Sequence, residues 1–152
     1  MLHGLWQNER GFALMELVFV IMIIMIVSAI AVSTWFGAVE DRRVDSGTNQ
    51  LVADLRQAHT KATNRLVDQT VTVGLLADKS KYTLPNGDTA DLDDYPGANV
   101  VSVAAASTIV FKGDGSAQVT GANPITVRAT DNTGNNHTIG INLVTSRIKI
   151  DP

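Results

Sequence analysis

A single carboxylate stands inside the most apolar stretch of this 152-residue chain. Residues 12–32 read FALMELVFVIMIIMIVSAIAV, and Glu16 is the one charged residue among them. An acidic side chain in a membrane helix costs roughly 2.5–3.5 kcal/mol on insertion scales, so its presence indicates a function. Such a carboxylate needs a cationic partner, and the run itself contains no Lys, Arg or His.

Cleavage of the chain between Gly11 and Phe12 would create that partner. Phe12 would then carry a free ammonium group, one helical turn before Glu16 and on the same helix face. The ammonium would pair with Glu16 of its own chain or of a neighbouring chain. Pairing between neighbours would neutralise both charges and set the axial register between the two chains.

Two other interpretations of the apolar run stay open. Ala29-Ile30-Ala31 fits the small-x-small pattern of a signal peptidase site, which would release a secreted β-domain. The run is longer than the usual apolar region of a secretory signal, and a carboxylate near its start fits that signal poorly. A plain transmembrane anchor also fits, since about 20 helical residues span the roughly 30 Å of a bilayer core. That interpretation leaves Glu16 without a role.

The segment Arg10-Gly11-Phe12-Ala13-Leu14-Met15-Glu16, followed by the apolar run, resembles the class III signal of type IV pilins and pseudopilins. The resemblance implies that a membrane peptidase, the prepilin peptidase, cuts after Gly11 and methylates the amino group of Phe12. It also implies that Glu16 guides the assembly of subunits into a filament.

The remaining reactive side chains form no catalytic or metal-binding pattern. The absence of Cys excludes disulfides, thiol nucleophiles and Cys-ligated zinc. His3, His59 and His137 are far apart in the sequence; we expect His59 to be solvated or packed on a helix, and His137 to face solvent in a turn. No Gly-x-Ser-x-Gly, phosphate-loop or His-Glu-x-x-His pattern occurs. The sequence therefore predicts no enzyme, no cofactor and no metal site.

Two polar segments are interpreted as surface features. The stretch from Asp88 to Asp94 (DTADLDD) lacks the EF-hand pattern and is predicted to be a solvated acidic loop. Gly113-Asp114-Gly115 is predicted to be a hairpin turn.

A small basic group near the C-terminus is a candidate DNA contact. Arg147 and Lys149 would share one strand face, because strand side chains alternate with a period of two. Arg128, on another predicted strand, would join them. The net charge of −3 means that any contact with a polyanion is local, weak and salt-sensitive. An ordinary solvated sheet edge is the other interpretation of these residues.

A long helix over residues 12–66 must position the N-terminal residues. Trp35, Phe36 and Val39 mark the expected membrane exit. Beyond it, apolar and small residues recur at alternating spacings of four and three, which predicts a stripe that packs on the rest of the protein: Val44, Thr48, Leu51, Leu55, Ala58 and Ala62. A kink is expected at Gly37 or Gly47.

The rest of the chain alternates in a β pattern and is punctuated by turn residues. Strands are predicted over residues 69–76, 81–85, 100–104, 108–112, 124–129, 138–143 and 144–150, with turns at 85–88, 113–115 and 131–136. Short strands joined by hairpin turns favour an antiparallel sheet. The predicted fold class is therefore α+β, with a long N-terminal helix packed on an antiparallel β-sheet or β-sandwich.

The β-rich part also resembles the GspH/FimT branch of pseudopilins and minor pilins. The matching features are Ile109-Val110-Phe111-Lys112-Gly113, the alternating strand at Ile125-Thr126-Val127, and the closing Thr145-Ser146-Arg147-Ile148-Lys149-Ile150. The family's closing Gly-Arg pattern has Ser146 in place of the glycine here.

The two resemblances imply a domain plan and a role. Residues 1–11 would form the leader, 12–33 the transmembrane and assembly half of the helix, 34–66 its packing half, and 67–152 an antiparallel β head. The protein would be a pseudopilin or minor pilin of a type II secretion system or type IV pilus, anchored in the bacterial inner membrane with its β head outside. Its partners would be other pilins and the prepilin peptidase; a DNA-receptor minor pilin is the alternative role.

Overall fold

The computed structural model describes residues 9–75, 78–93, 101–129 and 136–151. Residues 1–8, which include His3, lie outside the described residues, as do Asp94 and all but the last residue of the predicted turn at 131–136. The chain divides into an N-terminal unit, residues 1–38, and a C-terminal unit, residues 39–152.

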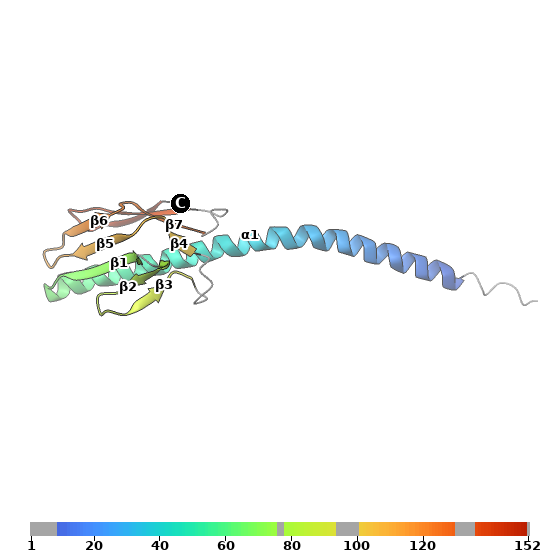
Figure 1. The fold of residues 1–152 in the computed structure, drawn as a ribbon, viewed down its shortest axis with the longest axis horizontal. Coiled ribbons are helices and arrows are strands. Elements are labelled where there is room, and N and C mark those ends of the chain that lie inside the picture. Colours follow the sequence, from blue (N-terminus) through green and yellow to red (C-terminus); the bar gives the residue numbers. More distant parts are fainter. Residues whose placement is uncertain (1–8, 76–77, 94–100, 130–135, 152) are drawn as a thin grey trace, which may run out of the picture. The chain divides into compact units, whose positions relative to one another are not determined.

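One helix, α1 (Glu9–Arg65), runs through both units (Figure 1). It confirms the predicted long helix, with bounds that differ by one to three residues from those predicted. At its end Leu66 adopts a left-handed conformation with φ of 53°, and the backbone N–H of Val67 donates to the Ala62 carbonyl at 3.3 Å. That bond closes the last turn as in a Schellman motif, which satisfies a carbonyl that the helix leaves free.

The strands form two antiparallel sheets, as the alternating sequence pattern predicts (Figure 1). The five-stranded sheet has the order β3-β2-β1-β5-β6, and the four-stranded sheet has the order β4-β7-β8-β9. The strand bounds are β1 (Gln69–Leu75), β2 (Asp78–Thr83), β3 (Thr89–Asp91), β4 (Val101–Val103), β5 (Ser107–Phe111), β6 (Ala117–Gly121), β7 (Ile125–Ala129), β8 (His137–Ile141) and β9 (Ile148–Asp151).

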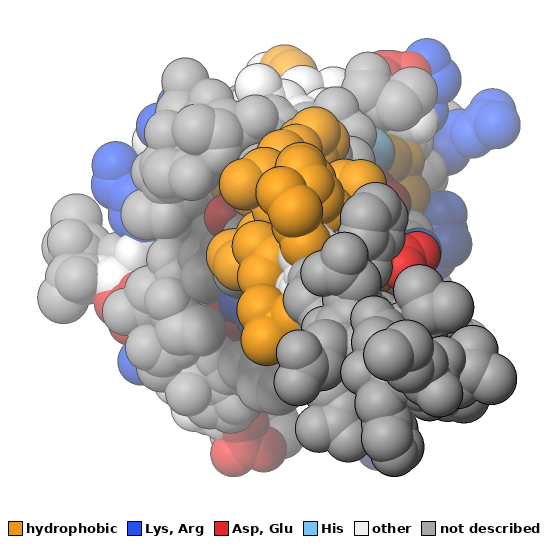
Figure 2. All heavy atoms as spheres, turned by 90° about the vertical axis from the view of Figure 1, so that its right-hand side faces the viewer, with side chains coloured by type: hydrophobic (Ala, Val, Ile, Leu, Met, Phe, Trp, Pro, Cys, Tyr) orange, Lys and Arg blue, Asp and Glu red, His pale blue; other side chains and the backbone are white. Residues whose placement is uncertain are grey.

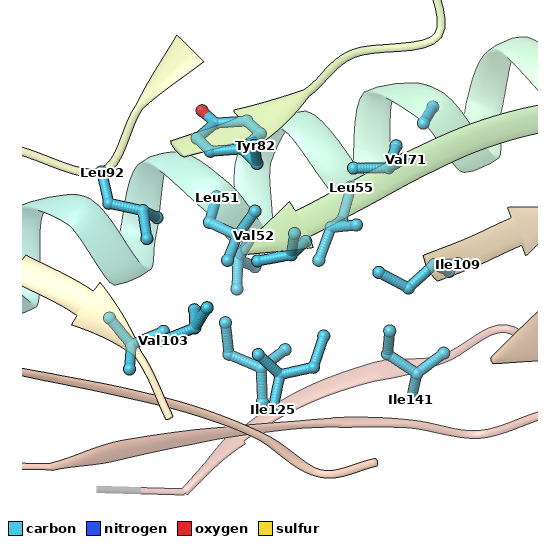
Figure 3. Packing of buried hydrophobic residues seen from close by; sticks show 14 of the residues in the cluster. Leu51, Val52, Leu55, Val71, Tyr82, Leu92, Val103, Ile109, Ile125 and Ile141 are labelled. Atoms are coloured by element: carbon cyan, nitrogen blue, oxygen red, sulfur yellow. The ribbon is translucent and has the colours of Figure 1, made fainter. Parts of the chain in front are cut away.

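The helix and the two sheets share one hydrophobic core in the C-terminal unit. Figure 3 shows Leu51 and Leu55 of α1 with side chains from both sheets, including Ile109 of β5 and Ile125 of β7. Every residue of the predicted helix stripe is buried: Val44, Thr48, Leu51, Leu55, Ala58 and Ala62. Burial of a leucine-sized side chain contributes about 1.5–3 kcal/mol, so this stripe holds α1 on the sheets.

Gly47 is a close-approach point in this packing. α1 continues through both Gly37 and Gly47, the two positions predicted for a kink, and the kink itself stays a prediction. A β-carbon at Gly47 would lie 2.1 Å from the Leu92 carbonyl oxygen, so only glycine lets the segment after β3 come this near the helix.

Three strand predictions were wrong. β3 and β6 fall in segments that were predicted to be loop, and residues 144–147 were predicted as strand but lie before β9. The Asn142 side chain explains the last error, since its Oδ1 accepts the backbone N–H groups of Val144 and Thr145, both at 3.0 Å. These bonds hold the chain in a turn that competes with strand pairing.

Candidate functional site

The N-terminal part of α1 is an exposed apolar surface. Leu14–Ala31 is long and apolar enough to cross a membrane, and none of it is buried within the structure. Figure 2 shows hydrophobic side chains gathered on the face seen from the N-terminal end of α1. Soluble proteins rarely leave a contiguous apolar surface of this size uncovered, so the segment belongs in lipid or against other helices.

Glu16 lies within this apolar surface. It lines a hollow of about 400 Å³ together with Met15, Phe19, Val20 and Ile23. Because the hollow is otherwise apolar, an ionised Glu16 placed in lipid or between helices gains little solvation there. The site therefore suits a cation supplied from outside this hollow.

Gly11 and Phe12 lie in the first turn of α1, two and three residues after its start at Glu9. Phe12 precedes Glu16 by four residues, which places the two on one helix face about 6 Å apart along the axis. The cleavage and methylation of Phe12 stay predictions.

A second hollow continues the Glu16 face toward the end of the N-terminal unit. It measures about 510 Å³ and is lined by Val27, Ile30, Ala31, Trp35 and Ala38. Val27 and Ile30 follow Glu16 by 11 and 14 residues, close to three and four whole turns. Trp35 was predicted only as a residue at the membrane exit, and the structure shows that it also lines this hollow.

The basic residues near the C-terminus are only partly brought together. Arg147 and Lys149 line one hollow of about 450 Å³, but Asp151 lines it too, and its Oδ1 lies 2.6 Å from the Lys149 ammonium. Arg128 stands opposite Ser102 in the β4–β7 pair, whereas Lys149 stands opposite Gly140 of β8. DNA contact by these residues stays a prediction, and the carboxylate of Asp151 lies beside Lys149 at the proposed surface.

His137 and the acidic loop were predicted to face solvent, and both predictions were wrong. In each case a side chain of α1 contacts the residue. His137 begins β8, and its Nε2 lies 2.5 Å from Asp45 Oδ1 of α1. Asp93 of the predicted solvated acidic loop is buried, and its Oδ2 lies 4.0 Å from Arg43 Nη1. Part of that loop is strand β3.

His59 and the hairpin turn behave as expected. The His59 ring packs edge-on against Phe111, with ring centroids 5.7 Å apart. Lys112 and Ser116 are joined across the turn at Gly113-Asp114-Gly115 by a 2.9 Å backbone hydrogen bond. Within the part of the chain that the structure describes, no three His, Asp or Glu side chains are grouped so as to hold a metal ion.

The comparison with protein families concerns the N-terminal segment alone. A family model described as the prokaryotic N-terminal methylation motif matches residues 6–32. No curated protein and no solved structure matches the chain. The matched motif is typical of type IV pilin-like proteins, and the α+β fold with a long apolar N-terminal helix is consistent with that class.

Proposed function

We propose that this chain is a structural subunit of GspH/FimT type, a pseudopilin or minor pilin, in a type II secretion system or type IV pilus. The prepilin peptidase cuts after Gly11 and methylates Phe12. The precursor is anchored in the bacterial inner membrane by α1, with residues 67–152 on the outer side. The chain acts by assembly and not by catalysis.

The observation that carries the proposal is the placement of Glu16 on an exposed apolar helix, four residues after Phe12. Cleavage after Gly11 would leave an ammonium at the N-terminus of α1, where the helix dipole disfavours a positive charge. A carboxylate one turn away offsets that cost, either in the same chain or in the neighbour next to it. Charge neutralisation within apolar surroundings then favours one register between adjacent helices over all others.

The apolar surface supplies the rest of the assembly energy. Lipid is as apolar as the helix, so helices associate in a membrane by close packing and polar contacts. The two hollows on the Glu16 face are places where side chains of a neighbouring helix would fit. Other pilin-like subunits are the partners that this face requires.

The N-terminus of the mature chain tests the processing step. Intact-mass measurement of the chain from cells with the prepilin peptidase should show loss of residues 1–11 and addition of one methyl group. Gly11→Val should block the cleavage, while Gly4→Val in the same leader should not. A mature chain that begins at Val32 would instead support a secreted domain released by signal peptidase.

Glu16→Gln tests the assembly step. The substitution keeps size and polarity but removes the charge, so membrane insertion and cleavage should persist while the amount of chain in sheared filaments falls about tenfold or more, as for a lost charge pair in apolar surroundings. Glu9→Gln is the matched control, because Glu9 would leave with the leader. Undiminished incorporation of the Glu16→Gln chain would reject the proposed role of Glu16.

A further inference from the structure

A polar hollow lies between α1 and the segment that joins β2 to β3. It measures about 370 Å³, and its lining comes entirely from the C-terminal unit. A volume at the small end of the roughly 300–1,000 Å³ of ligand sites suits one small organic group. We name it the α1–β2 hollow. The lining residues are Asp54, Gln57, Ala58, Lys61 and Arg65 of α1, Gln69 of β1, and Leu84, Pro85 and Asn86 after β2.

Two positive side chains line this hollow one helical turn apart. Lys61 and Arg65 share a face of α1, and like charges four residues apart destabilise a helix. Within the described part of the chain, neither side chain forms an ion pair with a carboxylate. Arg65 is in the last turn, where the helix dipole favours a cation, but that effect falls off within the turn and Lys61 precedes it. The helix alone therefore does not explain why both positions are basic.

The one acidic residue of the lining is engaged by β2. Asp54 is half-buried, and its Oδ2 accepts a hydrogen bond from the Tyr82 hydroxyl at 2.5 Å. The hollow thus combines two positive side chains with one negative side chain. A ligand with a single negative charge would be attracted by the two cations, whereas each further negative charge would be repelled by Asp54.

The wall opposite α1 is held by its own hydrogen bonds. The Leu84 N–H donates to the Asp88 carbonyl at 2.8 Å, and the Gly87 N–H donates to the Leu84 carbonyl at 2.9 Å. The Asn86 side-chain amide also donates to the Asp88 carboxylate at 2.5 Å. A wall that is ordered before a ligand arrives loses little conformational entropy on binding.

The lining favours a carboxylate over a phosphate. The planar Arg65 guanidinium matches a carboxylate in a two-bond fork, and the Lys61 ammonium adds a second donor. Apolar atoms of Ala58, Leu84 and Pro85 give methylene groups a surface to contact, which inorganic phosphate would not use. Phosphate also carries more than one negative charge near neutral pH and would be repelled by Asp54.

We infer that the α1–β2 hollow binds one carboxylate carried on a short aliphatic stem. An acidic side chain of a neighbouring subunit and a free small organic acid both present this group. The inference goes beyond the proposed function, because the hollow lies in the C-terminal unit and its chemistry does not depend on the apolar segment of α1.

An NMR titration of the full chain in a zwitterionic detergent at low salt tests the binding. The probe is N-acetylglutamate α-amide, which carries one carboxylate on a short stem. It should shift the signals of the Gln57 side-chain amide and the Arg65 Nε–H saturably, with a millimolar Kd. N-acetylglutamine α-amide is the matched control, because it has the same size without the charge. Equal shifts with both compounds, or tighter binding of inorganic phosphate, would overturn the inference.

Charge removal on α1 identifies the side chains that bind the probe. Lys61→Gln and Arg65→Gln should each raise the Kd about threefold, as expected for one solvent-exposed charge contact. Arg56→Gln is the matched control, since Arg56 is exposed on the same helix and does not line the hollow. All three positions are exposed, so the thermal unfolding midpoints should equal that of the parent. Equal weakening by Arg56→Gln would show general attraction to a basic helix and reject the hollow.

Carbodiimide coupling in cells that assemble the chain distinguishes the two sources. The reagent activates a carboxylate, and a Lys amine then displaces a urea, so that an amide forms with net loss of water. A Lys61 link to an Asp or Glu of a neighbouring subunit, absent in Lys61→Arg, identifies a protein carboxylate. Probe binding without such a link identifies a free organic acid. A Lys61 link to Asp54 of the same chain alone would overturn the inference, because the cation would then be neutralised from within.

The two proposals fail in different ways. If only the proposed function is wrong, the chain does not enter filaments, while the probe still binds and Lys61→Gln still weakens it. If only the hollow is wrong, filaments form in a Glu16-dependent manner and the probe gives no saturable shift.

Discussion

Asp45 on α1 and His137 at the first residue of β8 are joined side chain to side chain, with Oδ1 and Nε2 2.5 Å apart. The two residues are 92 positions apart in sequence, so the contact fastens the helix to the four-stranded sheet outside the hydrophobic core. Tyr82 makes the corresponding contact for the five-stranded sheet, since its hydroxyl donates to Asp54 of α1 at 2.5 Å.

We expect Asp45→Asn and His137→Gln each to lower the free energy of unfolding by about 1 kcal/mol, because each weakens a partly solvated polar contact. The double variant should cost less than the sum of the two single changes. Thermal unfolding in detergent micelles, followed by circular dichroism, gives the coupling energy. Additive effects would show that the contact contributes nothing.

Gly47→Ala should destabilise the protein, although alanine normally favours a helix over glycine by up to about 1 kcal/mol. The new β-carbon would meet the Leu92 carbonyl oxygen at 2.1 Å and force the segment after β3 away. The expected cost is about 1–3 kcal/mol, as for overpacked sites.

Gly140→Ala is the control for that change. A β-carbon at Gly140 would lie 4.0 Å from the Lys149 carbonyl oxygen, which is an ordinary contact distance. The substitution should therefore leave the free energy of unfolding unchanged or raise it. Chemical denaturation of both variants in the same detergent measures the two changes in the free energy of unfolding. Equal changes would contradict the packing argument.

Tyr82 should remain protonated well above the usual pH of tyrosine ionisation. Burial, followed by the hydrogen bond to Asp54, raises the pKa of the Tyr82 hydroxyl. The neutral phenol therefore stabilises the fold fully below the unfolded pKa of about 10, and that contribution is lost as pH rises further toward the folded pKa.

Phenolate absorbance of Tyr95→Phe, which leaves Tyr82 as the single tyrosine, should show no titration near pH 10 until the protein unfolds. Tyr82→Phe should cost about 1–2 kcal/mol at neutral pH, because Asp54 loses a donor. It should also weaken the dependence of stability on alkaline pH. Ordinary titration of Tyr82 in the folded protein would contradict both expectations.

Asp78 should keep its charge in acid. The side-chain hydrogen bond from Ser80, aided by that from Lys81, lowers the pKa of the Asp78 carboxyl to about 2. Since the folded value lies below the unfolded value of about 3.9, the stabilisation is present above that pH and is lost as pH falls toward 2.

Ser80→Ala removes the largest of these effects and should raise the pKa of Asp78, measured by carbon-detected NMR titration of its carboxyl group. Ser116→Ala, which removes a similar hydroxyl next to Asp114, should leave the Asp78 titration unchanged. A Ser80→Ala titration identical to that of the parent would show that the hydroxyl plays no part.

The sequence predicts well the features that depend on local periodicity. Leu51, Leu55 and their companions repeat at helical spacing, and all of them are buried. Strand β7 alternates apolar and polar residues, and its buried positions follow that alternation. The N-terminal methylation motif, matched over residues 6–32, is likewise a local pattern.

The features that the sequence misses are set by contacts between distant segments. β3 is a short Thr-Ala-Asp stretch that becomes a strand only because β2 pairs with it. The contacts of His137 with Asp45 and of Asp93 with Arg43 join segments that are far apart in the sequence, so no local pattern predicts them.

A last consequence concerns force. α1 supplies the apolar segment and one wall of the core without a linker between them. Tension applied at the N-terminus is thus transmitted by helical backbone directly to Leu51, Leu55 and the side chains around them. A pull on the apolar segment therefore reaches the core through α1 itself and not through a flexible tether.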